Sequence, residues 1–211
     1  MKKVLKNVYS LDHSEAGDHS LESWILDCNE GVVIIDGGMT PKAVQNIEDG
    51  LKELGKKWTD VSLILITHKH GDHVKNLPRL VELTGAPVKS EEHEALLIKD
   101  AVGVEVGGLK HNELVPYCGG IQVIHVPGHS EGNACYYLNK QKTIIAGDTI
   151  FEDEEGELCP PPERYCLDVK QATKEIKRLL EYNFDSLLIT HGEDIEERAK
   201  EKVEQLVERT S

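Results

Sequence analysis

The chain contains 211 residues, of which 39% are hydrophobic and 29% are charged. These fractions are those of a globular protein and exclude a disordered chain. Its 24 Lys and Arg residues against 38 Asp and Glu residues give a formal net charge of −14 at pH 7. Because this charge repels phosphate backbones and anionic lipids, we expect neither a nucleic-acid partner nor a membrane partner.

The apolar stretches are much shorter than the roughly 20 residues that a membrane span needs. The first residues reach Lys6 and Asn7 before the apolar segment of a signal peptide could form, which predicts a cytoplasmic protein. The five cysteines are odd in number and include no CxxC pair, so we expect reduced thiols. The composition is even and no linker or repeat is visible, which predicts a single domain over residues 1–211.

The first half of the chain alternates between strand and helix patterns. Short β-type runs are expected at residues 4–11, 24–27 and 32–36, the last two joined by a hairpin turn. A helix begins at Thr40-Pro41 and ends at Gly55. The following elements are a strand at 61–67, a short helix at 77–83, a strand at 87–88 and a helix from about residue 91.

The second half repeats this arrangement. Strands are expected at residues 121–126, 134–138, 143–146 and 186–190, and helices at 169–180 and 195–207. Each helix is apolar along one stripe only, so it should cover the outside of a sheet. The sequence therefore predicts an α+β fold with four layers, in the order helix, sheet, sheet, helix.

Four possible metal ligands follow the predicted strand at residues 61–67. His68 and His70 lie two positions apart in extended chain, so both can face one ion. Gly71 lets the backbone turn, after which Asp72 and His73 can reach a second point nearby. Histidine nitrogens and carboxylate oxygens are ordinary zinc ligands, so this HxHxDH segment predicts two half-sites.

Three further candidates share the same placement at the exit of a strand. They are His129 in Pro127-Gly128-His129, Asp148 in Ala146-Gly147-Asp148, and His191 in Thr190-His191-Gly192. A rigid sheet can present side chains from such positions into a common cleft.

These motifs, in this order, resemble the metallo-β-lactamase fold superfamily, whose members are αββα sandwiches. The resemblance implies that His68, His70 and His129 hold one metal ion. It implies that Asp72, His73 and His191 hold a second, with Asp148 bridging and Asp72 and Asp148 acting in catalysis. The expected cofactor is two Zn²⁺, with Fe or Mn as alternatives. Asp36 resembles the acidic position that orients a ligand histidine in this family, although a turn-forming role is equally compatible with the sequence.

Asp148 places the chain nearer to the hydrolases that resemble glyoxalase II, lactonases and ribonuclease Z than to true β-lactamases. The resemblance implies a metal-dependent hydrolase that uses a metal-bridging hydroxide to cleave a small thioester or ester. A thiolate leaves without protonation, whereas an alkoxide needs an acid, so a thioester is preferred. Tyr165 is a possible acid or substrate contact, or else a solvated residue of the loop at 152–168, which could be a lid.

Two alternatives on the same fold stay open. One is an iron enzyme resembling persulfide dioxygenases, with a single metal on His68, His129 and Asp148. The other is a metal-dependent ribonuclease, for which the chain shows no basic surface. The helical extension by which glyoxalase II proteins recognise glutathione is not evident, so glutathione specificity is not expected. His13 and His19 could border the cleft or face solvent, and His93, His111 and His125 receive no role. The exact substrate and the oligomeric state are left open.

Overall fold

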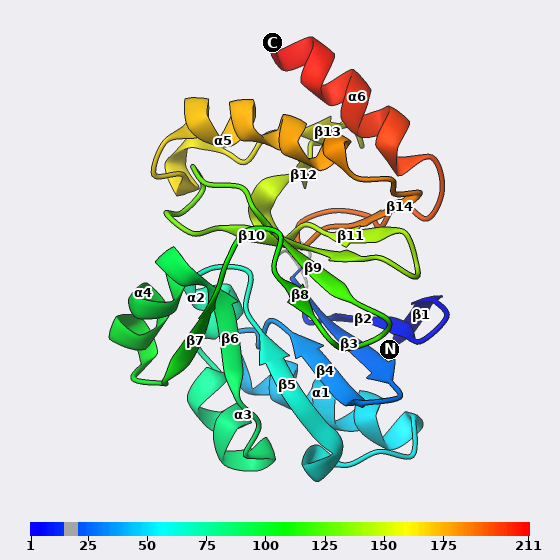
Figure 1. Ribbon diagram of the computed structural model, residues 1–211, viewed down its shortest axis with the longest axis vertical. Helices are drawn as coiled ribbons and strands as arrows, with labels where there is room; N and C mark the ends of the chain where they lie inside the picture. Colours follow the sequence, from blue (N-terminus) through cyan, green and yellow to red (C-terminus); the bar gives the residue numbers. More distant parts are fainter. Residues whose placement is uncertain (15–20) are drawn as a thin grey trace.

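Two sheets face each other in the computed structural model, which describes residues 1–14 and 21–211 (Figure 1). The seven-stranded sheet follows chain order: β1 (Lys2–Leu5), β2 (Val8–Asp12), β3 (Glu22–Cys28), β4 (Gly31–Ile35), β5 (Val61–Leu65), β6 (Val88–Glu91) and β7 (Val106–Leu109). The five-stranded sheet has the order β14 (Ser186–Leu188), β11 (Thr143–Ile145), β10 (Ala134–Leu138), β9 (Ile121–His125) and β8 (Leu114–Val115). A small hairpin pairs β12 (Phe151–Glu152) with β13 (Leu158–Cys159).

Helices cover the outer face of each sheet (Figure 1). On the seven-stranded sheet these are α1 (Pro41–Glu53), α3 (Leu77–Thr84) and α4 (Glu92–Val102), with the short η1 (Trp58–Asp60) and α2 (Gly71–Val74). On the five-stranded sheet these are α5 (Val169–Glu175), η4 (Ile176–Glu181) and α6 (Ala199–Thr210), while η2 (Gly147–Thr149) and η3 (Glu163–Tyr165) lie in loops. The predicted αββα layering is confirmed.

The sequences of the strands are continuous apolar runs because both faces of each sheet are covered. In β3, Trp24 and Leu26 belong to the core between the two sheets, whereas Ile25 belongs to the core beneath α1. In β5, Leu63 and Leu65 face the other sheet and Ile64 faces the helices. A third core joins the five-stranded sheet to η4 and α6. The alternation of side chains along each strand therefore divides one apolar run between two cores.

The strands that precede the candidate ligands all point the same way within their sheets. β4 and β5 are parallel, and β11 and β14 are parallel. β9 and β11 are each antiparallel to β10, so they too share one direction. The carboxyl ends of these strands therefore gather at one edge of the sandwich, the edge at which open α/β sheets bind their ligands.

Several element boundaries differ from the sequence predictions. The expected strand at 4–11 is a hairpin of β1 and β2, which turns at Asn7 with φ of 64°. The helix at 169–180 changes from α5 to the tighter η4. The expected terminal helix begins at Ala199 rather than at residue 195, because Ile195 pairs with Leu187 as a β-bridge. β7 was not predicted, since Gly107 and Gly108 weaken its strand pattern.

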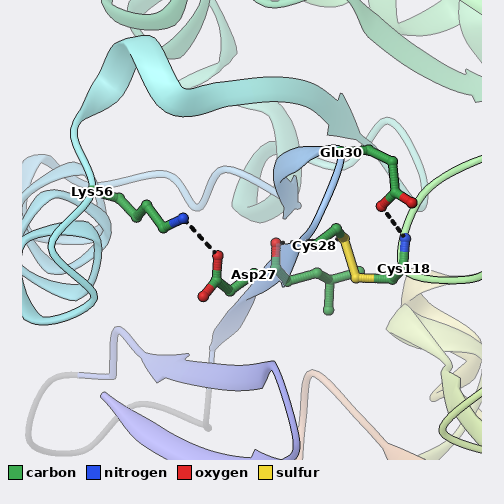
Figure 2. Close-up of a disulfide and its surroundings, with 6 residues drawn as sticks. Asp27, Cys28, Glu30, Lys56 and Cys118 are labelled. Atoms are coloured by element: carbon green, nitrogen blue, oxygen red, sulfur yellow. Dashed lines mark hydrogen bonds and ion pairs between the residues drawn. A yellow bond between two sulfur atoms is a disulfide. The ribbon is translucent and has the colours of Figure 1, made fainter.

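The expectation of five reduced thiols is wrong for one pair. Cys28 and Cys118 form a disulfide (Figure 2). Cys135, Cys159 and Cys166 are free thiols. Cys28 ends β3 and Cys118 precedes β9, so the bond links the two sheets at the edge opposite the gathered carboxyl ends. The backbone N–H of Cys118 also donates to a carboxylate oxygen of Glu30 at 3.2 Å. The sequence hid this pair because 90 positions separate its members.

Within residues 1–14 and 21–211, the helices are too short or too polar to cross a lipid bilayer.

Candidate metal centre

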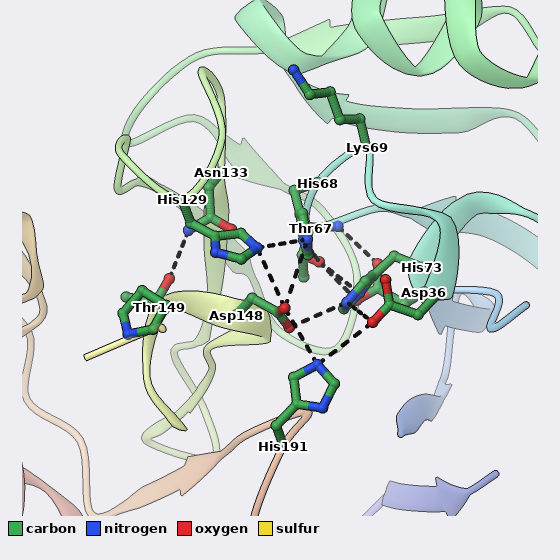
Figure 3. A network of polar contacts seen from close by, with 12 residues as sticks. Asp36, Thr67, His68, Lys69, His73, His129, Asn133, Asp148, Thr149 and His191 are labelled. Carbon is green, nitrogen blue, oxygen red and sulfur yellow. Dashed lines mark hydrogen bonds and ion pairs between the residues drawn. The ribbon is translucent and has the colours of Figure 1, made fainter. Parts of the chain in front are cut away.

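Strand ends deliver all seven predicted ligands to the shared edge of the sandwich (Figure 3). β5 leads through Thr67 into His68, His70, Asp72 and His73, the last two within α2. β9 leads into His129, β11 into Asp148 in η2, and β14 into His191. Residues up to 123 positions apart, from His68 to His191, thus meet in one place.

Two groups of side chains meet there, and Asp148 belongs to both. The first contains His68, His70, His129 and Asp148, and the second contains Asp72, His73, Asp148 and His191. Within each group the possible ligand atoms all lie within 4.8 Å of one another. Each group has the composition and number of ligands of a zinc site, so the residues present fit a bound metal cation.

Asp148 lies between the groups: Oδ2 faces histidines of both groups, and Oδ1 faces the second group only through His73. Its Oδ2 is 3.3 Å from Nε2 of His129 and 3.8 Å from Nε2 of His68. Its Oδ1 is 3.2 Å from Nε2 of His73, and Oδ2 is also 3.3 Å from Nε2 of His191. One carboxylate in this position can bridge two cations.

The contact between His73 and Asp148 requires positive charge. Nε2 of His73 and Oδ1 of Asp148 are buried, and neither makes a hydrogen bond with the residues that the structure describes. Burial alone would lower the pKa of His73, but the carboxylates of Asp36, Asp148 and Asp72 raise that pKa well above its usual value. The field that retains a proton on this ring also attracts a metal cation, which would satisfy both buried atoms.

In the first group, two histidines have lowered pKa values, in contrast to His73. Burial holds the pKa of His68 well below its usual value, and burial lowers the pKa of His70 to about 4. Nε2 of His129 lies only 3.1 Å from Nε2 of His68, so at most one of the two facing nitrogens can carry a proton. Neutral imidazoles with converging lone pairs are the form in which histidine binds metals.

Asp36 orients His73 from the side away from Asp148. Its Oδ2 accepts the Nδ1–H of His73 at 2.8 Å, and its Oδ1 accepts the backbone N–H of Thr67 at 2.8 Å. The Thr67 hydroxyl donates to Oδ2 at 2.8 Å (Figure 3). Asp36 is fully buried and has φ of 60°, a conformation that costs energy for a residue other than glycine. The turn-forming alternative therefore does not describe what this carboxylate contacts.

Sequence reasoning missed Glu94, which fixes two of the ligand loops. This fully buried carboxylate accepts the backbone N–H of Lys69 at 2.7 Å and that of Gly132 at 2.6 Å. Lys69 separates His68 from His70, and Gly132 belongs to the loop that carries His129. A signal was present in the sequence, because Glu94 falls on the buried face of α4 beside Ala95 and Ile98.

A cavity of about 860 Å³ opens over the centre. His70, Asp72, Asp148 and His191 line it, together with Leu21, Met39, Phe151 and much of the segment 152–165. Tyr165 lines the same cavity and is 47% exposed, beside Arg164, whose guanidinium lies 4.7 Å from the Tyr165 ring centroid. The loop at 152–168 therefore forms one wall of this cavity.

The end of that loop is tied to the loop that carries His129. The backbone N–H of Leu167 donates to the carbonyl of His129 at 3.1 Å, and that of Asp168 donates to the carbonyl of Gly128 at 2.8 Å. Sγ of Cys166 lies 3.8 Å from Nδ1 of His129. A change in this wall is thus transmitted directly to a candidate metal ligand.

The remaining histidines differ from their expected settings. His13 neither borders the cavity nor faces solvent, because it is 3% exposed and its Nε2 lies 2.9 Å from the Ser23 hydroxyl. Burial lowers its pKa to about 4. His19 lies outside the described residues. His93 and His125, to which the sequence assigned no role, meet at Glu91.

Comparison with known proteins agrees with this architecture. Residues 20–191 match the model of the metallo-beta-lactamase superfamily. A hydroxyacylglutathione hydrolase of Ectopseudomonas mendocina is 38% identical over 102 residues, which are 48% of this chain and 37% of that protein. A probable metallo-hydrolase of Bacillus subtilis is 24% identical over 188 residues, 83% of this chain and 82% of that protein.

The chain thus spans little more than a third of the length of the hydroxyacylglutathione hydrolase that it matches. Among solved structures, a metallo-beta-lactamase from Pontibacter korlensis superimposes with a TM-score of 0.80 at 21% identity, covering 98% of this chain and 97% of that one. These likenesses confirm the resemblance predicted from the motifs. The matched residues include all seven candidate ligands, and the chain belongs to the metallo-beta-lactamase superfamily.

Proposed function

We propose that the protein is a metal-dependent hydrolase that cleaves a small thioester or ester. Two Zn²⁺ ions would be held by the two groups, one by His68, His70 and His129 and the other by Asp72, His73 and His191, with Asp148 shared. The observation that carries this proposal is the position of Asp148, whose carboxylate lies within 3.3 Å of histidine nitrogens from both groups. A single metal ion bound by the first group would leave the buried Nε2 of His73 without a hydrogen-bond partner among the described residues.

Bound zinc ions would supply a water molecule activated at neutral pH and positive charge for a carbonyl oxygen. The protein's own residues provide the positioning. Asp36 fixes the ring of His73, and Glu94 fixes the backbone of the two loops that carry the histidines of the first group. Because reaction rates depend steeply on the placement of reacting groups, these buried carboxylates support catalysis without contacting substrate.

The cavity favours a small substrate of low charge. Its wall carries three acidic residues, Glu152, Asp153 and Glu154, against Arg164, the one arginine or lysine among the described residues that line it. A polyanion would be repelled by this wall and by the net charge of −14, which argues against the ribonuclease alternative. The apolar side chains of Leu21, Met39 and Phe151 suit an acyl chain.

The leaving group distinguishes thioesters from oxygen esters. A thiol has a pKa near 8.5 and leaves as a thiolate, whereas an alkoxide needs a proton in the transition state. Tyr165 lies in the cavity wall and is the candidate donor for an ester substrate. The similarity to the hydroxyacylglutathione hydrolase covers 37% of that protein's length, so it supports a thioester without specifying its thiol.

The test combines metal analysis with turnover. Purified protein should contain at least two equivalents of zinc per chain and should hydrolyse a simple acyl thioester, with activity lost on chelation and regained with zinc. The variants His70→Ala and His73→Ala should each lose turnover and metal, whereas His111→Ala, outside the centre, should retain both. Stoichiometric iron without zinc, together with oxygen uptake on a persulfide, would instead establish the single-metal alternative.

We propose cytoplasmic residence, which the state of the disulfide tests. Disulfides such as Cys28–Cys118 are typical of oxidising compartments and are rare in the cytosol of mesophiles. Trapping thiols with an alkylating agent at cell lysis, followed by mass spectrometry, would determine the state of this pair. If the protein is cytoplasmic, it should be recovered with the cells and not in the secreted fraction.

A further inference from the structure

We propose that Glu91, His93 and His125 form a third metal site, which binds a divalent transition metal such as Zn²⁺ outside the seven-residue centre. Glu91 ends β6, His93 lies in the first turn of α4, and His125 ends β9. One possible ligand atom from each lies within 4.8 Å of the others. The proposal does not depend on the hydrolase activity, because it uses none of the residues assigned to that activity.

The spacing of the three atoms is that of metal ligands. Oε1 of Glu91 is 2.9 Å from Nδ1 of His93 and 3.7 Å from Nδ1 of His125. Ligands bound at about 2.1 Å in tetrahedral zinc sites are about 3.4 Å apart, and the two measured distances bracket this value. The 3.7 Å separation exceeds that of a hydrogen bond, so a bond between His125 and Glu91 does not explain it.

The tautomer of His125 leaves its lone pair directed at this carboxylate. Nε2 of His125 lies 3.0 Å from the backbone carbonyl oxygen of Glu131. A carbonyl oxygen only accepts, so Nε2 must carry the hydrogen, and Nδ1 of the neutral ring is an acceptor. Nδ1 therefore faces Oε1 of Glu91 as one acceptor facing another, an arrangement that a cation between them would stabilise. Backbone carbonyls fix the outer nitrogen of metal-binding histidines in the same way.

The carboxylate of Glu91 is buried and contacts both histidines of the proposed site. The side chain is 1% exposed, and its Oε2 accepts the backbone N–H of His93 at 2.7 Å, as the cap of α4. Both oxygens approach Nδ1 of His93, Oε1 at 2.9 Å and Oε2 at 3.2 Å, and Oε1 also faces Nδ1 of His125 at 3.7 Å. The two imidazole rings are nearly parallel, with an interplanar angle of 14° and centroids 5.2 Å apart. A proton on Nδ1 of His93 would pair that ring with Glu91, but Nδ1 of His125 would still face Oε1 of Glu91 at 3.7 Å.

His93 leaves the site open to solvent, because its side chain is 60% exposed. An ion could enter from that side and keep a water molecule as its fourth ligand. His111 is adjacent but has another partner, since its Nδ1 accepts the backbone N–H of His125 at 3.2 Å. His111 therefore serves as the matched control for removing a neighbouring imidazole.

A metal at this site would hold α4 against the end of β9, four residues before His129. One turn further along α4, Glu94 holds the backbone of Lys69 and Gly132. The predicted consequence is that the third ion stabilises the two loops that carry the first group of ligands. It would do so without contacting the substrate.

The experiment measures zinc binding to the full chain and to three variants. The metal-free protein is titrated with Zn²⁺, and bound zinc is counted by elemental analysis after gel filtration in buffer containing free micromolar zinc. We expect His93→Ala/His125→Ala and Glu91→Gln each to bind one ion per chain fewer than the unchanged protein, and His111→Ala to bind the same number. In a crystal grown with zinc, anomalous scattering should place an ion between Glu91, His93 and His125.

Thermal unfolding supplies a readout independent of counting. Added zinc should raise the melting temperature of the His70→Ala/His73→Ala protein, and this rise should disappear when His93 and His125 are also replaced. Equal zinc content in the unchanged protein and the His93→Ala/His125→Ala variant would overturn the proposal. So would an anomalous map with density at the seven-residue centre and none at Glu91. If His70→Ala lost turnover but still bound the third ion, the third site would be supported independently of the hydrolase activity.

Discussion

The carboxylate of Asp36 lies 2.8 Å from Nδ1 of His73, while Nε2 of the same ring faces Asp148 at 3.2 Å. The ring is therefore held between two carboxylates, one of which orients it and one of which can share a cation with it. Asp36 belongs to the end of β4 and His73 to α2, so this contact connects the hairpin at the start of the chain to the HxHxDH segment.

Replacing Asp36 with Asn should weaken metal binding without unfolding the protein. The amide cannot offer two acceptor oxygens to His73 and Thr67, so the ring loses its fixed orientation. We expect metal affinity to fall about 10–100-fold, measured by competition with a chromophoric chelator. Asp49→Asn, on the exposed face of α1, is the matched control. Unchanged affinity in Asp36→Asn would show that the contact does not position the ligand.

Glu94→Gln should destabilise the protein and disorder the ligand loops. The amide keeps one acceptor oxygen but turns an NH₂ group toward a backbone N–H of Lys69 or Gly132, which leaves a buried donor unpaired. We expect the free energy of unfolding to fall by about 1–3 kcal/mol, measured by urea denaturation. The exposed Glu92→Gln change on the same helix should have little effect. If both variants unfolded at the same urea concentration, Glu94 would not anchor the loops.

The disulfide should affect stability rather than turnover. Cys28 and Cys118 close a long loop at the edge of the sandwich opposite the candidate centre. We expect Cys28→Ser/Cys118→Ser to lose about 2–4 kcal/mol of unfolding free energy in denaturant titrations. The rate of thioester hydrolysis at low temperature should stay within about twofold, because catalytic groups are not moved. Cys159→Ser controls for the loss of a thiol, and a large loss of turnover in the double variant alone would contradict this separation.

A buried pair of carboxyl groups predicts a stability that falls with rising pH. Burial, with the nearby Asp194, raises the pKa of Glu22 to about 8, and burial raises the pKa of Asp194 to about 6. Oε2 of Glu22 and Oδ1 of Asp194 are buried without hydrogen-bond partners among the described residues. Because the folded state binds these protons more tightly than the unfolded state, the contribution of the two groups to stability is fullest below their ordinary pKa values of 3.8 and 4.5. It is lost as the pH rises through about 6 and about 8.

Glu22→Gln should therefore be more stable than the unchanged protein at alkaline pH. We expect a gain of about 1 kcal/mol or more above pH 8, where the unchanged Glu22 must ionise in its buried site, and no gain near pH 5. Melting temperatures across this range measure the difference, with Glu48→Gln on the exposed side of α1 as control. A gain that did not change with pH would indicate a packing effect instead.

Tyr165→Phe should separate the two substrate classes. If the Tyr165 hydroxyl delivers a proton to an alkoxide, its loss should lower kcat for an oxygen ester by about 100-fold, while thioester turnover changes little. Paired kinetic measurements on esters and thioesters with the same acyl group give this comparison. Tyr9→Phe, outside the cavity, is the control. Equal losses for both substrates would assign Tyr165 to binding rather than to proton transfer.

The sequence by itself determined the candidate ligand set and the order of layers. HxHxDH is a local pattern, and each further ligand follows a strand whose apolar run is recognisable without its partners. One-sided apolar stripes were enough to place helices outside two sheets. These features depend on neighbouring positions, so a single sequence carries them.

Only the tertiary structure decided what the remote residues do. Glu94, Glu91 and His125 look like ordinary helix and strand residues until α4 is packed beside the loop that carries His129. The Cys28–Cys118 pair could not be read from spacing, because 90 positions separate the two sulfurs and the direction of each strand brings them together. Backbone donors, lone pairs and buried charges find their partners through packing across the sheets, and no local pattern records that packing.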